Sequence, residues 1–320
     1  MNRQKNAKTF GDWAYIAIEL NYHKILEHEK EVLKDKDPEE LHQMRVRMRR
    51  LRSAIGGFSP ALNLPKTARE KKVGKIAKIL GTLRDLDVLG ETLENQYKPI
   101  LLPVEQKEID RALKYFKKQR YLAFKQVQIA LNGDTYQDLK KGFENWLKDP
   151  QYQLIADINI QAILPDLLLP QIGKLLLHPA WLIGTNLEAG EVTIRDGLES
   201  QEVEKLLETQ GLSLHDLRKE AKRTRYLMEL FTQFYNTEYK TYLSDIKIIQ
   251  SVLGEIQDSF VLGNFITEVF SKDFHKTMPG LASQLTKCRY DKWQQWQQLQ
   301  QKFLTPQTRQ DLHKTIFHPL

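Results

Sequence analysis

The chain has 320 residues, of which 41% are hydrophobic and 28% are charged, a composition typical of a soluble globular protein and not of a disordered one. Its single cysteine, Cys288, excludes an intramolecular disulfide and favours a reducing compartment. The N-terminus leads into no apolar stretch of the signal-peptide type, so we expect a cytoplasmic protein.

The net charge of +7 is distributed unevenly along the chain. Residues 1–150 hold 30 Lys and Arg against 21 Asp and Glu, whereas residues 151–320 hold 18 against 20. The first half is therefore the stronger candidate for contact with a polyanion.

Apolar residues recur at helical spacing along nearly the whole chain, which predicts an all-α fold. Asp37-Pro38 is a typical helix start, and Gly56-Gly57 before Pro60 is a typical helix end. The predicted helices lie at about 8–35, 39–57, 66–97, 103–131, 135–148, 160–177, 213–235, 239–270 and 280–303, with a short piece after them.

Residues 178–200 are predicted to form an insertion or connecting loop with one small strand at 191–195. The apolar stretch 163–183 is interrupted by prolines and charged residues, so we interpret it as core helix plus loop, with no membrane span. The glutamine-rich helix around Trp293 and Trp296 is interpreted as a packing element.

A basic segment that begins with a histidine and is predicted to be helical occurs twice in the sequence. His42-Gln-Met-Arg-Val-Arg-Met-Arg-Arg-Leu-Arg52 corresponds to His215-Asp-Leu-Arg-Lys-Glu-Ala-Lys-Arg-Thr-Arg225, at an offset of 173 residues. The segment 80–89, which begins Leu-Gly, corresponds to 253–262 at the same offset. Two motifs in one register indicate a duplicated fold unit, with 1–150 as a first helical bundle and 151–320 as a second within one domain.

On a helical wheel the first copy separates into two stripes. Leu41, Met44, Met48, Leu51 and Ile55 form an apolar stripe, and the basic residues form another. Like charges three or four residues apart destabilise an isolated helix, so we expect a negatively charged group to offset the repulsion. The basic stripe holds His42, Arg45, Arg49 and Arg52 with Arg50 beside it, and its second copy holds His215, Arg218, Lys222 and Arg225.

Two further segments carry cations at helical spacing. One is formed by Lys71, Lys75 and Lys78, one turn before the Leu-Gly segment. The other runs along the predicted helix 103–131. Its members are Arg111, Lys114, Lys118, Tyr121 and Lys125.

The pattern His-x-x-Arg-x-x-x-Arg-Arg-Leu-Arg, followed by Leu-Gly-x-x-Arg-Asp-x-Asp-Val, resembles the CHAD domain, the conserved histidine α-helical domain. The resemblance covers nearly the whole chain, with Gln257 where the second Arg-Asp would have its arginine, and 178–200 unmatched. It implies two four-helix bundles related by a pseudo-two-fold axis, with a basic groove or channel between them. It also implies binding of inorganic polyphosphate, often at polyphosphate granules, with polyphosphate-metabolising enzymes among the candidate partners.

Polyphosphate has many charges and no bases, so its receptor needs rows of cations and no hydrogen-bond code. Arginine suits this task because its planar fork holds two phosphate oxygens at once, and lysine adds point charge. We therefore predict a non-catalytic polyphosphate-binding protein without cofactor or metal. The candidate binding residues are His42, Arg45, Arg49, Arg50, Arg52, Lys71, Lys75, Lys78, Arg84, Lys114, Lys118, His215, Arg218, Lys219, Lys222, Arg223 and Arg225.

Three alternatives compete with this interpretation. His215-Asp216 resembles the dipeptide of metal-dependent HD phosphohydrolases, but Gln43 stands at the equivalent position of the first copy. Eight scattered histidines and one cysteine form no metal-ligand pattern of recognised spacing, and Asp85 and Asp87 beside Arg84 indicate internal salt bridges. Nucleic acid, RNA in particular, is the strongest competitor, although only Tyr121 and Tyr226 accompany the basic stripes as stacking partners.

Overall fold

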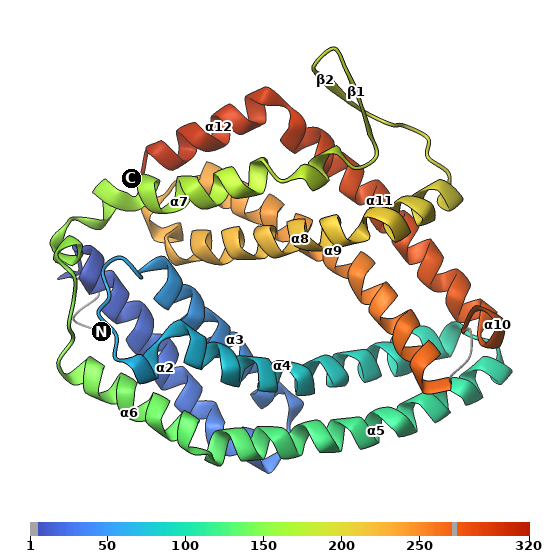
Figure 1. The fold of residues 1–320 in the computed structure, drawn as a ribbon, viewed down its shortest axis with the longest axis horizontal. Coiled ribbons are helices and arrows are strands. Elements are labelled where there is room, and N and C mark those ends of the chain that lie inside the picture. Colours follow the sequence, from blue (N-terminus) through green and yellow to red (C-terminus); the bar gives the residue numbers. More distant parts are fainter. Residues whose placement is uncertain (1–5, 271–273) are drawn as a thin grey trace. The chain divides into compact units, whose positions relative to one another are not determined.

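The computed structural model describes residues 6–270 and 274–320. Within these ranges the chain is almost entirely helical, with one two-stranded sheet (Figure 1). The predicted all-α fold class is confirmed.

The chain divides into two compact units. The first comprises Met1–Gln96 and Ile109–Ile163, and the second comprises Tyr97–Glu108 and Leu164–Leu320. Each unit therefore contains part of the helix Pro103–Asn132. The division of the sequence at residue 150 and the groove between the halves stay predictions.

Three consecutive helices carry the core of unit 1. These are α2 (Phe10–Lys34), α3 (Pro38–Gly57) and α4 (Glu70–Thr92), which lie side by side in Figure 1. Phe10, Met44, Met48 and Leu80 are fully buried, because the apolar residues of each helix recur at intervals of three and four and face the same side. The unit is completed by α5 (Pro103–Asn132) from Ile109 onward, α6 (Asp134–Lys148), and the short helices η1 (Lys66–Ala68) and η4 (Leu154–Asp157).

An arginine of α5 ties three parts of unit 1 together. The two terminal nitrogens of Arg120 each donate to a different oxygen of Asp35 at 2.6 Å, and its Nε donates to Asp87 at 2.7 Å. Asp35 ends α2 in the left-handed conformation (φ 52°), and Asp87 lies on α4. Burial raises the pKa of Asp87, while the Arg120 guanidinium acts in the opposite direction. This bidentate geometry fixes α4 against α2 and α5.

Unit 2 is formed mainly by long helices. These are α7 (Ile160–Leu176, from Leu164 onward), α8 (Ser200–Leu230), α9 (Thr237–Phe270), α11 (Pro279–Leu304) and α12 (Pro306–Phe317). Trp181 stacks on Trp296 and on Phe303, and Trp293 is fully buried, which confirms that the glutamine-rich helix packs in the core. The smaller elements are η2 (Leu93–Tyr97), η3 (Lys98–Ile100), η5 (Pro179–Leu182), β1 (Thr185–Glu188), β2 (Glu191–Ile194), η6 (Thr232–Phe234) and α10 (Phe274–Thr277).

A buried carboxylate joins the first turn of α5 to the start of α11 within unit 2. Glu105 is only 4% exposed and accepts hydrogen bonds from the backbone N–H groups of Gly280 at 2.7 Å and Leu281 at 3.3 Å. These N–H groups begin α11 and have no partner within their own helix, so the carboxylate caps it. Glu105 and Gly280 are 175 residues apart in the sequence.

Two predicted elements differ from the structure. The helix predicted at 213–235 begins at Ser200 and ends at Leu230, because Glu199 and Glu202 form a capping box at its start. Gly211 lies inside that helix, and the burial of Val203 and Leu207 offsets its cost of about 1 kcal/mol. The predicted helix 66–97 is divided into η1, α4 and the π-helical turn η2.

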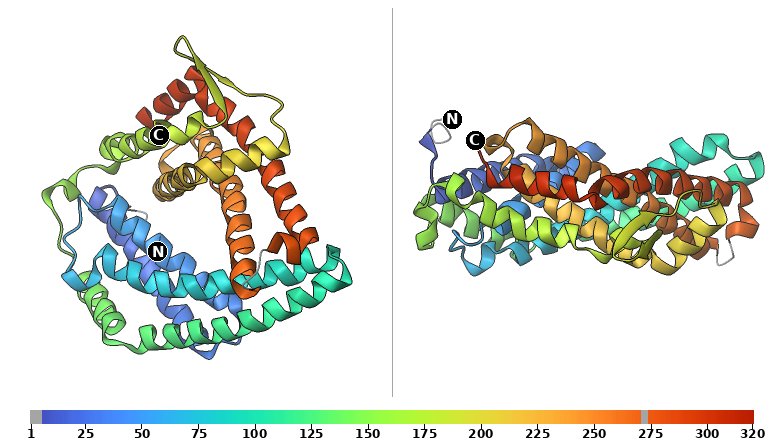
Figure 2. Two further views of the ribbon diagram at one scale, coloured as in Figure 1. Left: turned by 45° about the vertical axis from the view of Figure 1, so that its right-hand side comes forward. Right: turned by 90° about the horizontal axis from the view of Figure 1, so that it is seen from above.

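Residues 178–200 contain the expected strand, with a partner that the sequence analysis did not identify. β1 and β2 form an antiparallel hairpin that projects from the helices of unit 2 (Figure 2). Ala189 and Gly190 both have positive φ, at 50° and 87°, as the right-handed twist of a two-residue hairpin turn requires.

One segment in the described ranges, Ile160–Leu182, is long and apolar enough to be a candidate membrane span by length and composition. A single segment of this kind is a weak indication, because core helices of soluble proteins have the same properties. Pro165 and Pro170 lie inside its helix.

Replacement of Arg120 by methionine should destabilise unit 1. The change leaves Asp35 and the 6%-exposed carboxylate of Asp87 without their cation, which we expect to cost about 2–3 kcal/mol, less than for a fully buried pair. The free energy of unfolding from urea titration measures the effect. Lys117→Met is the matched control, because Lys117 is exposed on the same helix, and equal losses in both variants would contradict the assigned role.

Candidate functional site

The basic stripe lies on α3, and its helix forms as the sequence predicts. The Asp37 carboxylate accepts from the backbone N–H of Glu39 at 2.8 Å, and Pro38 occupies the first turn. All five residues of the predicted apolar stripe are buried. The opposite face therefore presents the arginines to solvent and to α4.

Two arginines of the stripe cross to α4 and meet carboxylates there. Arg45 donates to Asp85 at 3.2 Å, and Nε of Arg52 donates to Glu70 at 2.8 Å. Because the earlier residue of α3 meets the later residue of α4, the two helices run antiparallel. The negative charge that the like-charged stripe requires is thus supplied partly by the neighbouring helix.

Glycines of α4 make room for these crossings. A methyl group at Gly81 would lie 3.6 Å from Nε of Arg45, and one at Gly74 would lie 3.3 Å from Nε of Arg52. Arg49 lies on the same face of α3, between the two crossing arginines. The glycines therefore mark the side of α4 that faces the stripe.

Three lysines of α4 extend this positive surface. On the helical wheel Lys71, Lys75 and Lys78 lie roughly 40–100° from the Gly74–Gly81 line, on the solvent side. All three are exposed, and none has a carboxylate within 4.0 Å among the described residues. The same is true of Arg50 on α3. We name the set Arg45, Arg49, Arg52, Lys71, Lys75 and Lys78 the α3–α4 basic face.

The second copy repeats the first crossing at the same offset of 173 residues. Arg218 of α8 lies 3.8 Å from Asp258 of α9, and a methyl group at Gly254 would lie 3.1 Å from its Nε. These residues are the equivalents of Arg45, Asp85 and Gly81. The duplication therefore preserves a three-residue contact as well as a sequence motif.

The other cations of the second copy have acidic partners close by in the sequence. Lys219 pairs with Asp216 at 2.8 Å, Arg223 pairs with Glu220, and Arg225 pairs with Glu229 at 3.1 Å. Arg225 also lies over the ring of Tyr226, 4.4 Å from its centroid. Lys222 is exposed. Acidic residues of α8 therefore lie beside the second stripe and lower its net positive charge.

The two histidines that lead the stripes are half-buried. Burial lowers the pKa of His215, and the charges of Lys219 and Arg218 lower it further. Its Nδ1 is buried without a hydrogen-bond partner among the described residues. His215 is therefore neutral at pH 7 in the free protein, and a nearby anion would favour its protonation.

The acidic residues of the Arg-Asp-x-Asp motif form salt bridges, as expected, but with more distant partners. Asp85 pairs with Arg45, Asp87 pairs with Arg120, and Arg84 lies 3.5 Å from Glu91. The side chain of Arg84 is only 16% exposed, so it is less accessible than that of Arg45 or Arg52. Among the described residues no group of three or more His, Cys, Asp or Glu is placed to hold a metal ion.

The predicted stripe on α5 lies on the exposed side of that helix. Lys114 and Lys118 are exposed, and no hydrogen bond or ion pair connects them to the α3–α4 basic face within the described ranges. Tyr121 is 58% exposed, with Nζ of Lys125 5.4 Å from its ring centroid. The structure thus brings the α3 and α4 candidates together through printed contacts and leaves the α5 candidates exposed on their own helix.

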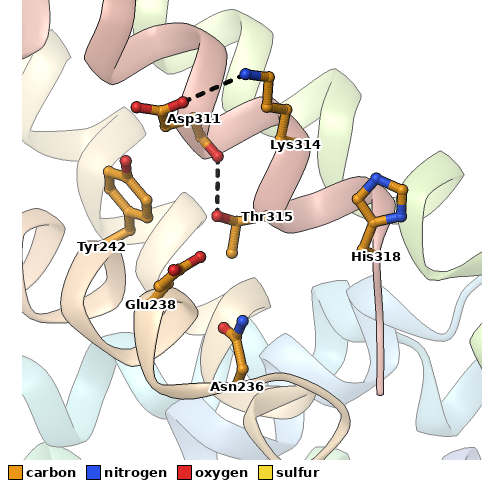
Figure 3. Close-up of a pocket in the computed structure, with 7 residues that line it drawn as sticks. All are labelled: Asn236, Glu238, Tyr242, Asp311, Lys314, Thr315 and His318. Atoms are coloured by element: carbon orange, nitrogen blue, oxygen red, sulfur yellow. Dashed lines mark hydrogen bonds and ion pairs between the residues drawn. The ribbon is translucent and has the colours of Figure 1, made fainter.

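A cavity of about 630 Å³ in unit 2 has a different character (Figure 3). Glu238, Tyr242, Asp311 and Lys314 line it, and none of the predicted binding residues does. Burial raises the pKa of Tyr242, and the charges of Asp311 and Asp245 add to the effect. With two carboxylates in its wall, this cavity disfavours a polyanion.

The family model of the CHAD domain matches residues 16–267. The chain belongs to the CHAD domain family. The crystal structure of the CHAD domain from the plant Ricinus communis is similar, with a TM-score of 0.61, 20% identity, and coverage of 98% of this chain and 94% of that one.

PptA from Streptomyces chartreusis is similar in fold as well, with a TM-score of 0.67 at 12% identity. The match covers 92% of this chain and 100% of that one. No curated protein matched the sequence. At these identities the two solved structures support the CHAD fold, and the binding residues are argued from this chain alone.

The sequence alone did not reveal which carboxylates pair with the arginines or which glycines make room for them. Glu70, Gly74 and Gly81 were outside the candidate set, and Asp85 was considered only as a salt-bridging residue. The signal was present in the sequence, because Arg45, Gly81 and Asp85 all recur at the offset of 173 residues.

An NMR titration of the histidine ring should show the lowered pKa of His215. We expect a midpoint below the ordinary 6.5, with the ring neutral above that midpoint and charged below it. Lys219→Gln should move the midpoint upward by a fraction of the shift, because burial remains as the larger cause. His215→Gln assigns the resonance, and a midpoint above 6.5 would contradict the assignment.

Proposed function

We propose that this protein binds inorganic polyphosphate through the α3–α4 basic face, without catalysing a reaction on it. The observation that carries the proposal is the alignment of Arg45, Arg49 and Arg52 beside three exposed lysines without carboxylate partners. Family membership supports it, because the CHAD domain is associated with polyphosphate.

The spacing of the cations suits a linear ligand of uniform charge. Side chains three and four residues apart on a helix are about 5–6 Å apart, so a stripe offers charge at short regular intervals. Arginine forks hold two oxygens in one plane, and flexible lysines follow the chain beside them. The face as defined contains no aromatic side chain on which a base could stack.

A purely binding role agrees with the pairing of the acidic groups. Asp85 and Glu70 are engaged by arginines, and Asp87 is engaged by Arg120, so these carboxylates serve the architecture. We further propose that the protein acts in the cytoplasm at polyphosphate granules, beside enzymes of polyphosphate metabolism.

RNA is the second candidate ligand, because phosphate contacts look alike in both polymers. The exposed Tyr121 with Lys125 beside it is the observation in its favour. Against it, the α3–α4 basic face contains no aromatic residue, and in the second copy Arg225 covers the ring of Tyr226.

Competition binding at near-physiological salt separates the two ligands. Long-chain polyphosphate, single-stranded RNA and duplex DNA are compared at equal phosphate concentration. We expect clear preference for polyphosphate, and a steep salt dependence with a log–log slope of roughly −0.7 per neutralised phosphate, as for single-stranded nucleic acid. Equal or better binding of RNA would replace the proposal with the second candidate.

Reversal of two charges in the centre of the face should remove most of the binding. Arg45→Glu with Arg49→Glu eliminates two charge-assisted contacts, so we expect polyphosphate affinity to fall about 100-fold or more. Isothermal calorimetry measures the affinity, and circular dichroism checks the fold. Arg45→Gln with Arg49→Gln provides a milder pair, and unchanged affinity in both pairs would refute the site.

The first copy should contribute more than the second. Arg49→Glu should weaken binding several-fold more than Lys222→Glu, because acidic residues on α8 already neutralise the stripe around Lys222. Lys222 occupies the position equivalent to Arg49. Equal losses in calorimetry would show that both copies bind alike.

A further inference from the structure

We propose that Asp85 and Asp258 are positioning residues, which hold the first arginine of each basic stripe in place for an anionic ligand. This inference rests on the proposed function and deepens it. It has an unusual consequence, because it assigns to two negative charges a favourable role in binding a polyanion.

The two contacts differ in length, with a hydrogen bond of 3.2 Å between Arg45 and Asp85 and an ion pair of 3.8 Å between Arg218 and Asp258, but their side chains are covered to a similar degree. The side chain of Arg45 is 30% exposed and that of Asp85 is 66% exposed, while Arg218 and Asp258 are 28% and 66% exposed. In both copies the arginine is half-covered and the carboxylate is open to water. Both guanidinium groups can therefore still be reached by a ligand on their solvent side.

A glycine under each arginine completes the arrangement. Gly81 and Gly254 lie four residues before the aspartates, one helical turn away on the same side. The guanidinium thus lies across a bare stretch of helix backbone, with the carboxylate at its end. The backbone limits the side chain from below, and the aspartate limits it along the helix.

Other acidic residues near the stripes do not have this geometry. Glu70 holds Arg52 across the helix pair, but Leu243 stands at its equivalent position in the second copy. Asp216 pairs with Lys219 on its own helix, and Gln43 stands at its equivalent in the first copy. Among these contacts of the described residues, the arginine–aspartate contact is the one that occurs in both copies.

Two opposing effects decide what removal of the aspartate does. Loss of a negative charge near the ligand raises the affinity for a polyanion through long-range electrostatics. Loss of the arginine's partner frees a long side chain, which must then be ordered again on binding. If the aspartate positions the arginine, the second effect exceeds the first.

The test is a double-mutant cycle on polyphosphate affinity with Asp85→Asn and Arg45→Gln. In the wild-type background we expect Asp85→Asn to weaken binding about threefold or more, the size of a lost partly exposed pair. In the Arg45→Gln background the same change should strengthen binding, because only the charge effect remains. Asp216→Asn is the matched control, and we expect it to strengthen binding in the wild-type background.

The glycines provide a second test that leaves every charge unchanged. A methyl group at Gly254 would lie 3.1 Å and 3.2 Å from Nε and Nη2 of Arg218, whereas at Gly81 the nearest atom of Arg45 is at the ordinary distance of 3.6 Å. Gly254→Ala should therefore displace its arginine and weaken binding about twofold or more, while Gly81→Ala should leave the affinity within error. Both exchanges raise the helix propensity equally, and circular dichroism checks that both variants keep the fold.

The experiments distinguish a failure of the proposed function from a failure of the positioning role. Wild-type protein that does not bind polyphosphate at low salt would refute the proposed function itself. Wild-type binding together with unchanged or stronger binding by Asp85→Asn in both backgrounds would refute positioning and keep the function. A loss of binding that accompanies unfolding, seen in the circular dichroism spectrum, would assign Asp85 a structural role instead and overturn the inference.

Discussion

The repulsion among stacked arginines on one helix is the constraint on which the site depends. Arg45, Arg49 and Arg52 recur at intervals of four and three, a spacing that weakens an isolated helix by a few tenths of a kcal/mol per pair. The protein offsets this with carboxylates from the antiparallel neighbour, Asp85 and Glu70. Burial of the opposite face of α3 supplies the larger stabilisation, about 1.5–3 kcal/mol for each fully buried apolar side chain. The like-charged stripe is tolerated because burial of the apolar face of α3 stabilises the helix by more than the repulsion destabilises it.

The motif around Asp85 and Asp87 connects this site to the architecture of unit 1. These two carboxylates are two residues apart on α4, so they point in different directions around the helix. Asp87 binds Arg120, which also binds Asp35 at the end of α2, and Asp85 binds Arg45 on α3. Asp87 therefore fixes α4 within unit 1, and Asp85 contacts Arg45 from the position that α4 then has. Stability and, in the proposed function, binding are divided between two residues of one short motif.

Sequence periodicity was sufficient for the all-α class and for most helix positions, because amphipathic helices carry their pattern locally. The start of α8 was predicted thirteen residues late, since Gly211 and the preceding loop signals outweighed a glutamate capping box that only the structure makes plain. Partners distant in the chain were the main omission. Glu105 caps α11 from 175 residues away, and no local pattern indicates that contact. The duplicated register did contain the Arg45–Asp85 pair, because residues in contact within a repeat keep a constant separation in both copies.

The two copies show how a duplicated helix can keep its geometry while its electrostatics change. Arg218, Gly254 and Asp258 preserve the crossing contact, but Asp216, Glu220 and Glu229 now neutralise the cations beside it. An exposed pair on one helix turn, such as Lys219 with Asp216, contributes only about 0.2–0.5 kcal/mol, so a ligand separates it at little cost. The effect of the acidic residues on binding comes instead from net charge, which remains after the pairs are separated and repels each phosphate that approaches. In the proposed function, the second copy is the weaker receptor because of the charge of its acidic residues and not because of the strength of their salt bridges. The contact between Arg218 and Asp258 is nevertheless retained, so the second copy keeps the geometry of the first copy with a different net charge.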